Sequence, residues 1–461
     1  MRMTPWLPWA LLAALALTGG PAGSQNRSPG VDACVDNRFH SAVQYWNDAR
    51  STGARLEPQE ARFHGIAYAR LAMLAEETYP FACRLTADLA SLYLEAPGSG
   101  EAAFLKGMAL AGLAEWQGAE EAFTLAAKAP GSRKAGAAFW RQVVARKVAG
   151  KPVEWDRLEG QAADRVMARF LIEGILEPVT TQAEGWWKDY LQVLTAVNSG
   201  DAGRAETLLA ETLFPPRVLR LAGRETAVEF YDPTALVLAQ LVWAERARQE
   251  LEAALKESAQ GKDTRYCLVR VLCMLDEDSL AQAHLEAIKD VNYRQRGEAH
   301  LAASWKRTGQ DSRAQAAWVK LLDSKDYYAR ADAACFLFLA GARRDKAKRT
   351  LRTACDRSKA EQQVYLSLAK MYQAEGAQDS VRYYLSRGYN RNSTEVSRWN
   401  LPEYQVAFAQ SCYLGGRLGY PEATQTLYFL QNEFPFMRGL HDAIQRLFSA
   451  SLPTVNGDTK E

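Results

Sequence analysis

A period of 33–34 residues runs through the C-terminal half of this 461-residue chain. Four compact residues mark it at spacings of 33, 33 and 34 positions: Ala281, Ala314, Ala347 and Val381. A large apolar residue stands nine positions before each of them, namely Leu272, Trp305, Phe338 and Tyr372. Another stands four positions after each, namely Leu285, Trp318, Leu351 and Leu385. Columns of matching character at one fixed period predict a repeated structural unit.

The spacing within each period predicts a helical hairpin. The large residue at −9 and a compact one at −12 lie three positions apart, as on one face of a first helix. A turn follows, marked by Gly309, Gly341 and Gly376 in three of the repeats. The compact residue then belongs to a second helix, where the two helices approach most closely. One hairpin cannot cover its own apolar face, so neighbouring hairpins must stack.

These columns resemble the tetratricopeptide repeat family over residues 262–395. The resemblance implies an all-α, right-handed α-solenoid of antiparallel hairpins, that is, a tetratricopeptide-like superhelix. It also implies that the concave surface lined by the first helices is the usual peptide-binding face. The carboxylate-clamp pattern of some peptide-binding members is not reproduced, so that activity is not carried over.

The N-terminal half is helical but irregular. Apolar residues at helical spacing predict helices over Ala61–Glu77, Phe81–Leu94, Glu101–Glu115, Ala119–Ala129 and Lys134–Val148. Single copies of the repeat pattern recur near Ala119 and Ala205, and a weaker one near Ala423. The gaps between copies predict degenerate hairpins, with Pro152–Leu176 as one candidate. The stretch Arg217–Tyr231 is the one possible exception to the helical pattern.

The first 24 residues have the form of a signal peptide. Arg2 precedes a short apolar stretch over Trp6–Leu17, and small, turn-prone residues follow up to Ser24. The apolar stretch is about half of what a membrane-spanning helix needs. A buried N-terminal helix is the alternative. We therefore expect export, with a periplasmic or extracellular mature protein.

The expected organisation has four parts after the signal peptide. They are a linker at 25–37, degenerate helical repeats at 38–260, tetratricopeptide-like repeats at 261–448 and a disordered tail at 449–461. Among the seven cysteines, the pattern favours buried thiols for Cys267, Cys273, Cys335 and Cys412. A disulfide between Cys34 and Cys83 is possible in an exported protein.

Cations on the first helices are the main candidates for partner binding. They are Arg270, Arg296, Lys306, Arg307 and Lys370, with Asp263 and Asp332 opposing them. They could form a mildly basic groove for the carboxylates of a partner's tail, or a solvated helix face. Trp186, Trp187 and Tyr190 could form an aromatic binding platform, although such a cluster more often packs in a core.

Composition and motifs narrow the function. The 56 basic and 54 acidic residues nearly balance, which disfavours nucleic acid as the main partner. No nucleophile elbow, zinc-protease, P-loop or dinucleotide motif occurs, and Asp32, Cys34, Asp36 and His40 match no known metal loop. We expect no enzyme activity, cofactor or metal, and a scaffold for a protein or peptide partner in an envelope, secretion or surface complex. The alternative is an all-helical carbohydrate-binding or carbohydrate-active protein that uses Trp186 and Trp187; a structural subunit of a larger assembly is a third hypothesis.

Overall fold

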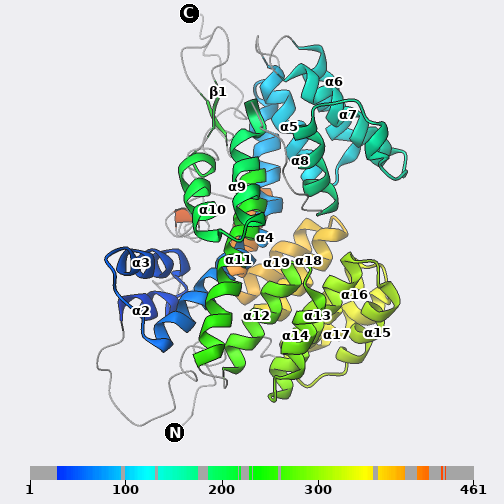
Figure 1. Cartoon of the computed structure of the whole chain (residues 1–461). Helices are drawn as coiled ribbons and strands as arrows, with labels where there is room; N and C mark the ends of the chain where they lie inside the picture. Colours follow the sequence, from blue (N-terminus) through cyan, green and yellow to red (C-terminus); the bar gives the residue numbers. More distant parts are fainter. Residues whose placement is uncertain are drawn as a thin grey trace, which may run out of the picture. The chain divides into compact units, whose positions relative to one another are not determined.

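The computed structural model describes residues 28–94, 99–129, 133–174, 185–215, 217–219, 228–230, 232–257, 261–356, 362–389, 402–414, 427–428 and 431. The chain divides into two compact units. Unit 1 combines residues 1–74 with 243–429, and unit 2 combines 75–242 with 430–461. The boundaries fall within two long helices, α4 (Pro58–Ser91) and α11 (Pro233–Glu257), as Figure 1 shows.

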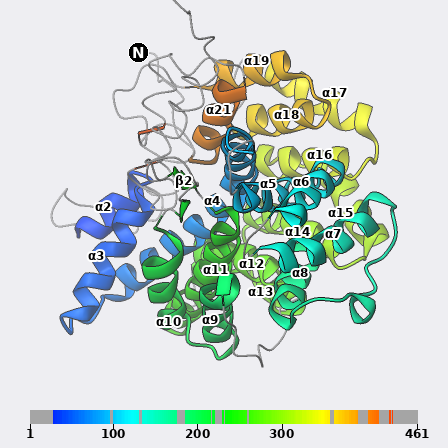
Figure 2. The ribbon, with the colours of Figure 1, turned by 90° about the horizontal axis from the view of Figure 1, so that it is seen from above.

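The C-terminal part of unit 1 is a stack of helical hairpins. Their first helices, called A helices below, are α12 (Lys262–Met274), α14 (Val291–Arg307), α16 (Tyr327–Leu339), α18 (Gln362–Ala374) and α21 (Pro402–Leu414). The second helices, called B helices, are α13 (Asp278–Glu286), α15 (Asp311–Leu321), α17 (Arg344–Asp356) and α19 (Gln378–Gly388). Each A helix packs on its own B helix and on the next A helix. The predicted period and the all-α solenoid are therefore confirmed, and Figure 2 shows the A helices following an arc.

The packing explains the repeat pattern. The compact residues of the B helices are buried, and Ala281, Ala314 and Ala347 have no exposed surface at all. Trp318, four positions after Ala314, is also buried and donates its indole N–H to the Ala299 carbonyl oxygen at 3.0 Å, which fixes the B helix on its A helix.

Left-handed backbone closes the hairpins where the sequence predicts turns. Gly309, Gly341 and Gly376 have φ angles of 82°, 75° and 72°. The first hairpin instead uses Asp276, at φ 55°, and aspartate is one of the few side chains that tolerate this region.

The rest of unit 1 is formed by α2 (Pro29–Val35), α3 (Phe39–Ser51), the first half of α4 and the second half of α11. Helix α2 lies within the stretch that we expected to be a linker. That expectation is wrong for these residues, because Val31, Ala33 and Cys34 are apolar at helical spacing and are buried.

Unit 2 also begins with stacked helices: α5 (Gly100–Gly112), α6 (Trp116–Lys128), α7 (Lys134–Val148) and α8 (Ala162–Glu173). The 3₁₀ turn η1 (Trp155–Arg157) lies between α7 and α8. A second group holds α9 (Lys188–Asn198) and α10 (Ala202–Leu208), with the 3₁₀ turn η2 (Gly185–Trp187) before α9 and the π-helical turn η3 (Leu209–Leu213) after α10. The hairpin of α5 and α6 contains the predicted copy near Ala119. A Cβ on Gly107 would lie 2.7 Å from the Phe123 ring, so only glycine allows this approach.

Two local features differ from a simple helical pattern. Strands β1 (Arg217–Leu219) and β2 (Val228–Phe230) pair antiparallel inside the one stretch that lacks a clear helical pattern. The two helices expected over 61–77 and 81–94 form the single helix α4, with Pro80 inside it. The break expected between residues 77 and 81 is therefore wrong, because apolar residues such as Phe81 and Leu85 continue the buried face beyond Pro80.

Several expectations fall outside the described residues: the signal peptide at 1–24, the tail at 449–461 and most of the repeat copy near Ala423. Among the residues that the structure describes, no helix is long and apolar enough to cross a membrane.

The buried alanines of the B helices, where each B helix lies closest to its A helix, give a direct test of the hairpin stack. We expect Ala314→Leu to lower the free energy of unfolding by about 1–3 kcal/mol, because the added atoms must fit where α14 and α15 touch. Ala316→Leu in the same helix is the control, since Ala316 is exposed and should tolerate the change. Urea unfolding of both variants measures the difference, and equal stabilities would contradict this packing.

Candidate functional site

The A helices carry the five cations that the sequence singled out, and several of them form ion pairs with acidic residues. Arg296 of α14 forms a largely buried ion pair. Its guanidinium donates to both carboxylate oxygens of Asp326 at 2.7–3.0 Å and stacks over the Tyr328 ring, with 4.2 Å to the ring centre. The side chains of Arg296 and Asp326 are only 14% and 4% exposed. Arg296 thus joins successive hairpins and is not presented to a partner.

A second polar network, centred on Asp332 of α16, links three consecutive A helices. His300 Nε2 of α14 lies 3.1 Å from one Asp332 oxygen, and the Gln363 amide of α18 donates to the other at 2.6 Å. Burial acts to raise the pKa of Asp332, but His300 and the charge of Arg270 outweigh it, so the pKa lies below its usual value. Arg270 therefore belongs to this network, and Asp332 is an ionised hub of the stack.

Lys306 and Arg307 lie at the end of α14, where each has a local acidic neighbour. Lys306 donates to Asp311 at 2.6 Å, and Arg307 donates to Asp276 at 3.1 Å and to the Cys273 carbonyl oxygen. Asp263, which we expected to oppose the cations, is buried and accepts from Arg62 of α4 at 3.0 Å. The cations predicted to form a basic groove are thus largely paired with acidic residues of the same chain.

Helix α4 contacts the A helices at both ends of the array. Arg62 reaches Asp263 in α12, the first A helix, and Arg70 reaches Glu403 in α21, the last one, at 2.9 Å. The residues of α4 from Phe63 to Leu74 are almost all buried. A segment of the chain itself therefore contacts the first and the last of the described A helices.

The two ion pairs also limit how straight the array can be. Arg62 and Arg70 are separated by roughly 12 Å along α4. Helices α12 and α21 are four steps apart in the array, and packed helices lie about 8–10 Å apart at each step, which gives roughly 40 Å for a straight row. Two arginine side chains cannot make up that difference, so the row of A helices must bend around α4.

A buried histidine lies on another face of α4. His64 has no exposed surface, and its Nδ1 is 3.8 Å from Glu250 of α11, which Arg50 holds with two hydrogen bonds of 2.5 and 2.7 Å. Neither ring nitrogen has a hydrogen-bond partner among the described residues. Burial lowers the pKa of His64 to about 3, and it outweighs the opposing effect of Glu250. The imidazole is therefore neutral in the folded protein.

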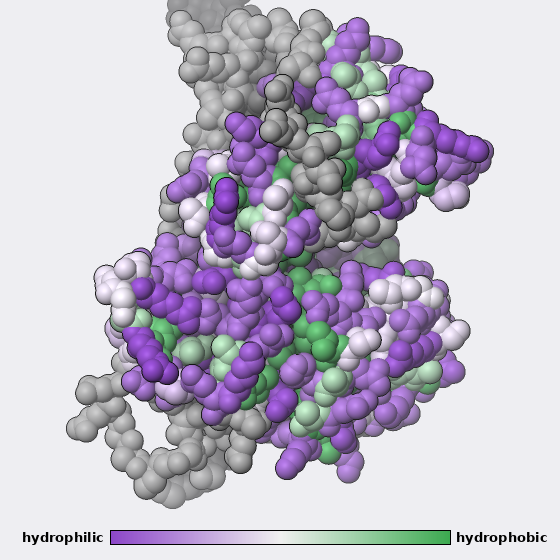
Figure 3. Space-filling model, viewed as in Figure 1, coloured by the Kyte–Doolittle hydropathy of each residue, from purple (hydrophilic) through white to green (hydrophobic). Residues whose placement is uncertain are grey.

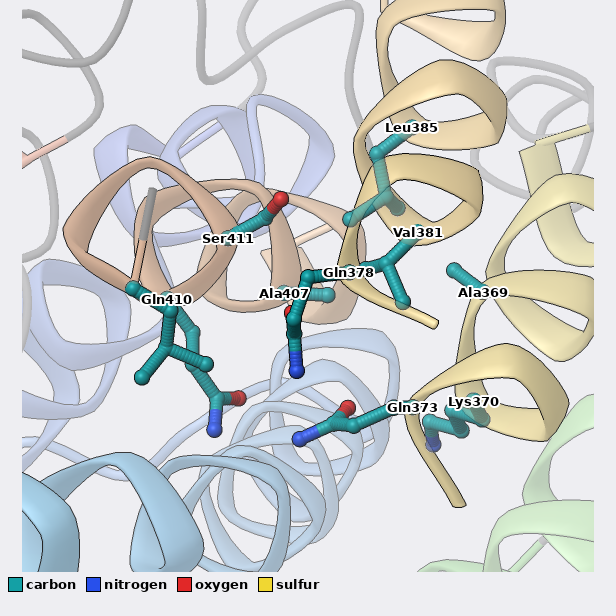
Figure 4. A pocket seen from close by; sticks show the side chains of 10 residues that line it. Ala369, Lys370, Gln373, Gln378, Val381, Leu385, Ala407, Gln410 and Ser411 are labelled. Carbon is teal, nitrogen blue, oxygen red and sulfur yellow. The ribbon is translucent and has the colours of Figure 1, made fainter. Parts of the chain in front are cut away.

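Lys370 differs from the other predicted cations because it lines a hollow. The hollow lies between α18, α19 and α21 and has a cavity volume of about 10 Å³, roughly the space of a single water molecule. Figure 4 shows the side chains of Lys370, Gln373, Gln378 and Gln410 around it, with Val381 and Leu385 on the apolar side.

The aromatic cluster of unit 2 is core. Trp187 and Tyr190 are 4% and 0% exposed, and the Trp187 indole donates to Asp164 at 2.7 Å. Trp186 is half-buried, and the Arg133 guanidinium lies 4.0 Å from its ring centre. The expectation of an open aromatic platform is wrong for Trp187 and Tyr190, because their rings pack inside the unit.

The cysteines are all unbonded and buried. The Cys34 thiol faces the Phe63 carbonyl oxygen in unit 1, whereas Cys83 interacts with Tyr79 in unit 2, so the disulfide that the sequence allowed between them is absent. Burial raises the pKa of both thiols to about 12, which leaves them protonated. Among the described residues, no group of three or more potential ligands is placed to hold a metal ion.

One charged surface lies on the B helices, outside the predicted sites. Helix α17 contains five basic residues and two acidic ones, in the order RDKAKRTLRTACD. This run of charge is visible in the sequence, but the predicted partner-binding cations all belong to the first helices. Figure 3 shows that the visible surface of the repeats is mostly hydrophilic, with smaller apolar areas.

No family model matches the sequence, and no curated protein matches it. Among solved structures, yeast Tom70 aligns at 11% identity and a TM-score of 0.33, over 91% of this chain and 94% of Tom70. The anaphase-promoting complex hetero-tetramer Cut9–Hcn1 aligns at 14% identity and a TM-score of 0.29, over 95% and 98% of the two chains.

The repeat class of the C-terminal part follows from the hairpins themselves. The C-terminal repeats are tetratricopeptide-like. Their period, their buried alanines and their A-to-A packing all follow that pattern. The resemblance noted from the sequence is thus confirmed in the fold.

The buried histidine predicts an acid-sensitive stability. The pKa of His64 is lower in the folded state than its ordinary 6.5. Its contribution to the free energy of unfolding is therefore fully present above pH 6.5 and is lost as the pH falls toward 3. Lowering the pH from 7 to 4.5 should reduce the free energy of unfolding by about 2–3 kcal/mol through this residue. We expect His64→Phe to lose less stability than wild type over the same interval in urea unfolding. Equal losses in the two proteins would contradict the buried, neutral imidazole.

Proposed function

We propose that the chain is a non-enzymatic scaffold that binds a protein or peptide partner through its helical hairpins. The observation that supports this most is the stack of repeats itself. Its A helices are joined by buried ties such as Arg296–Asp326, so the hairpins form a stiff framework. A stiff framework presents side chains at fixed positions, which lowers the entropic cost of binding.

The position of α4 bears on where that partner binds. The usual peptide-binding face of tetratricopeptide-like arrays is the A-helix side, and here α4 contacts that side at Asp263 and Glu403. The surfaces left to a partner are the B helices and the ends of the array.

We further propose that the protein acts outside the cytoplasm, in an envelope, secretion or surface complex. The support is the basic residue, short apolar stretch and small residues within positions 1–24. Cell fractionation with N-terminal sequencing tests this part. We expect a mature chain that begins near residue 25 and lies outside the cytoplasm, and an intact Met1 in the cytoplasm would refute export.

The binding role is tested by quantitative pull-down from the native cells with the full chain as bait. We expect at least one protein to be enriched reproducibly over a bait carrying Ala314→Leu, which weakens the stack. A chain that is monomeric by light scattering and enriches no protein would contradict the scaffold function.

A further inference from the structure

The outer surface of α17 gathers positive charge. Arg343, Arg344, Lys346, Arg349 and Arg352 are all exposed, within ten consecutive positions. Among the acidic residues of α17 whose side chains are described, only Asp345 shares this surface. The other B helices lack such a run, since α13 carries no lysine or arginine, and α15 and α19 each carry two cations and one aspartate.

These cations differ from those on the A helices in how they are paired. Arg296, Lys306 and Arg307 each have a carboxylate within 3.1 Å. Among the described residues, no carboxylate lies within ion-pair distance of Arg343, Lys346 or Arg349. Unpaired guanidiniums on a surface keep their capacity for two parallel hydrogen bonds to a carboxylate.

Tyrosines orient two guanidiniums of this surface, Arg352 within the run and Arg387 on α19. Arg352 Nε donates to the Tyr372 hydroxyl oxygen at 2.7 Å, and Tyr372 stacks on Tyr384 of α19 with 5.3 Å between ring centres. Arg387 of α19 is exposed and donates to the Tyr383 hydroxyl oxygen at 3.2 Å, while the Tyr383 side chain itself is 54% exposed. Hydrogen bonding to these tyrosines raises the pKa of both arginines, so they stay charged. Arginines held in place lose less entropy when they bind a carboxylate.

We propose that this basic outer surface, formed by Arg344, Lys346, Arg349, Arg352 and Arg387, docks an acidic, carboxylate-rich segment of the partner protein. The proposal rests on the scaffold function given above. It adds the surface and the chemistry of the partner.

The size of the surface favours a peptide segment over a phosphate polymer or a membrane. Arg344 and Arg352 are separated by roughly 12 Å along α17, the length of about four residues of extended peptide. The chain as a whole carries a net charge of only +2, so no broad basic field supports nucleic-acid or bilayer binding. The exposed Tyr383 ring adds apolar contact, which suits a polypeptide.

The test uses the full chain and a fluorescent peptide of alternating Glu and Ser, with a Gln-and-Ser peptide as the neutral control. We expect fluorescence anisotropy to show binding of the Glu peptide alone, weakening as salt is added. Arg349→Glu with Arg387→Glu should weaken binding by about tenfold or more. Both residues are exposed, so the variant should fold, and circular dichroism checks this.

The matched control is Lys289→Glu with Lys325→Glu. Both lysines are exposed in unit 1, lie outside α17 and α19, and give the same change in net charge. This variant should bind within about twofold of wild type. Equal weakening in the two variants, or no binding of the Glu peptide by wild type, would overturn the proposal. So would binding of phosphatidylserine vesicles or a DNA duplex, lost in Arg349→Glu with Arg387→Glu, without binding of the peptide.

The pull-down separates this proposal from the scaffold function. If the Arg349→Glu, Arg387→Glu variant captures the native partners as well as wild type does, the docking surface is wrong and the scaffold function stands. If wild type captures no partner, the scaffold function itself fails, whatever the peptide does.

Discussion

The incomplete burial of a single hairpin is the constraint on which this structure depends. A pair of helices of 9 to 17 residues has an apolar face that it cannot cover alone, so each A helix must lie against the next. The alanines at the closest approach allow that contact, and Ala281, Ala314 and Ala347 are fully buried in consequence. Once the A helices form a row, their polar side chains face one another. Arg296–Asp326 and His300–Asp332 are the result.

Local signals predicted the repeating part of the fold. Gly309, Gly341 and Gly376 close hairpins because left-handed backbone favours glycine, and this can be inferred from position in the period alone. The roles of the charged residues could not be predicted in the same way. Arg62 and Asp263 are 201 positions apart, and Arg70 and Glu403 are 333 apart, so no periodicity connects them. Without these partners, Asp263 looks like an exposed residue of a helix face, although the structure buries it.

The same long-range contacts change the functional interpretation. The family resemblance implies a ligand on the A-helix side, but α4 of the same chain contacts that side and bends the array around itself. Arginines of α4 form ion pairs with Asp263 and Glu403, whereas the arginines of α17 have no carboxylate partner among the described residues. The charge left over on the B helices is therefore the better guide to a partner than the charge on the A helices.

The position of α4 in unit 1 is the central claim, and hydrogen–deuterium exchange of the full chain tests it most directly. If α4 is held between α12 and α21, the amides of residues 63–74 should exchange as slowly as those in the middle of α14 and α16. Fast exchange across residues 63–74, with α12 to α18 still protected, would show that α4 does not belong to the folded core of the array.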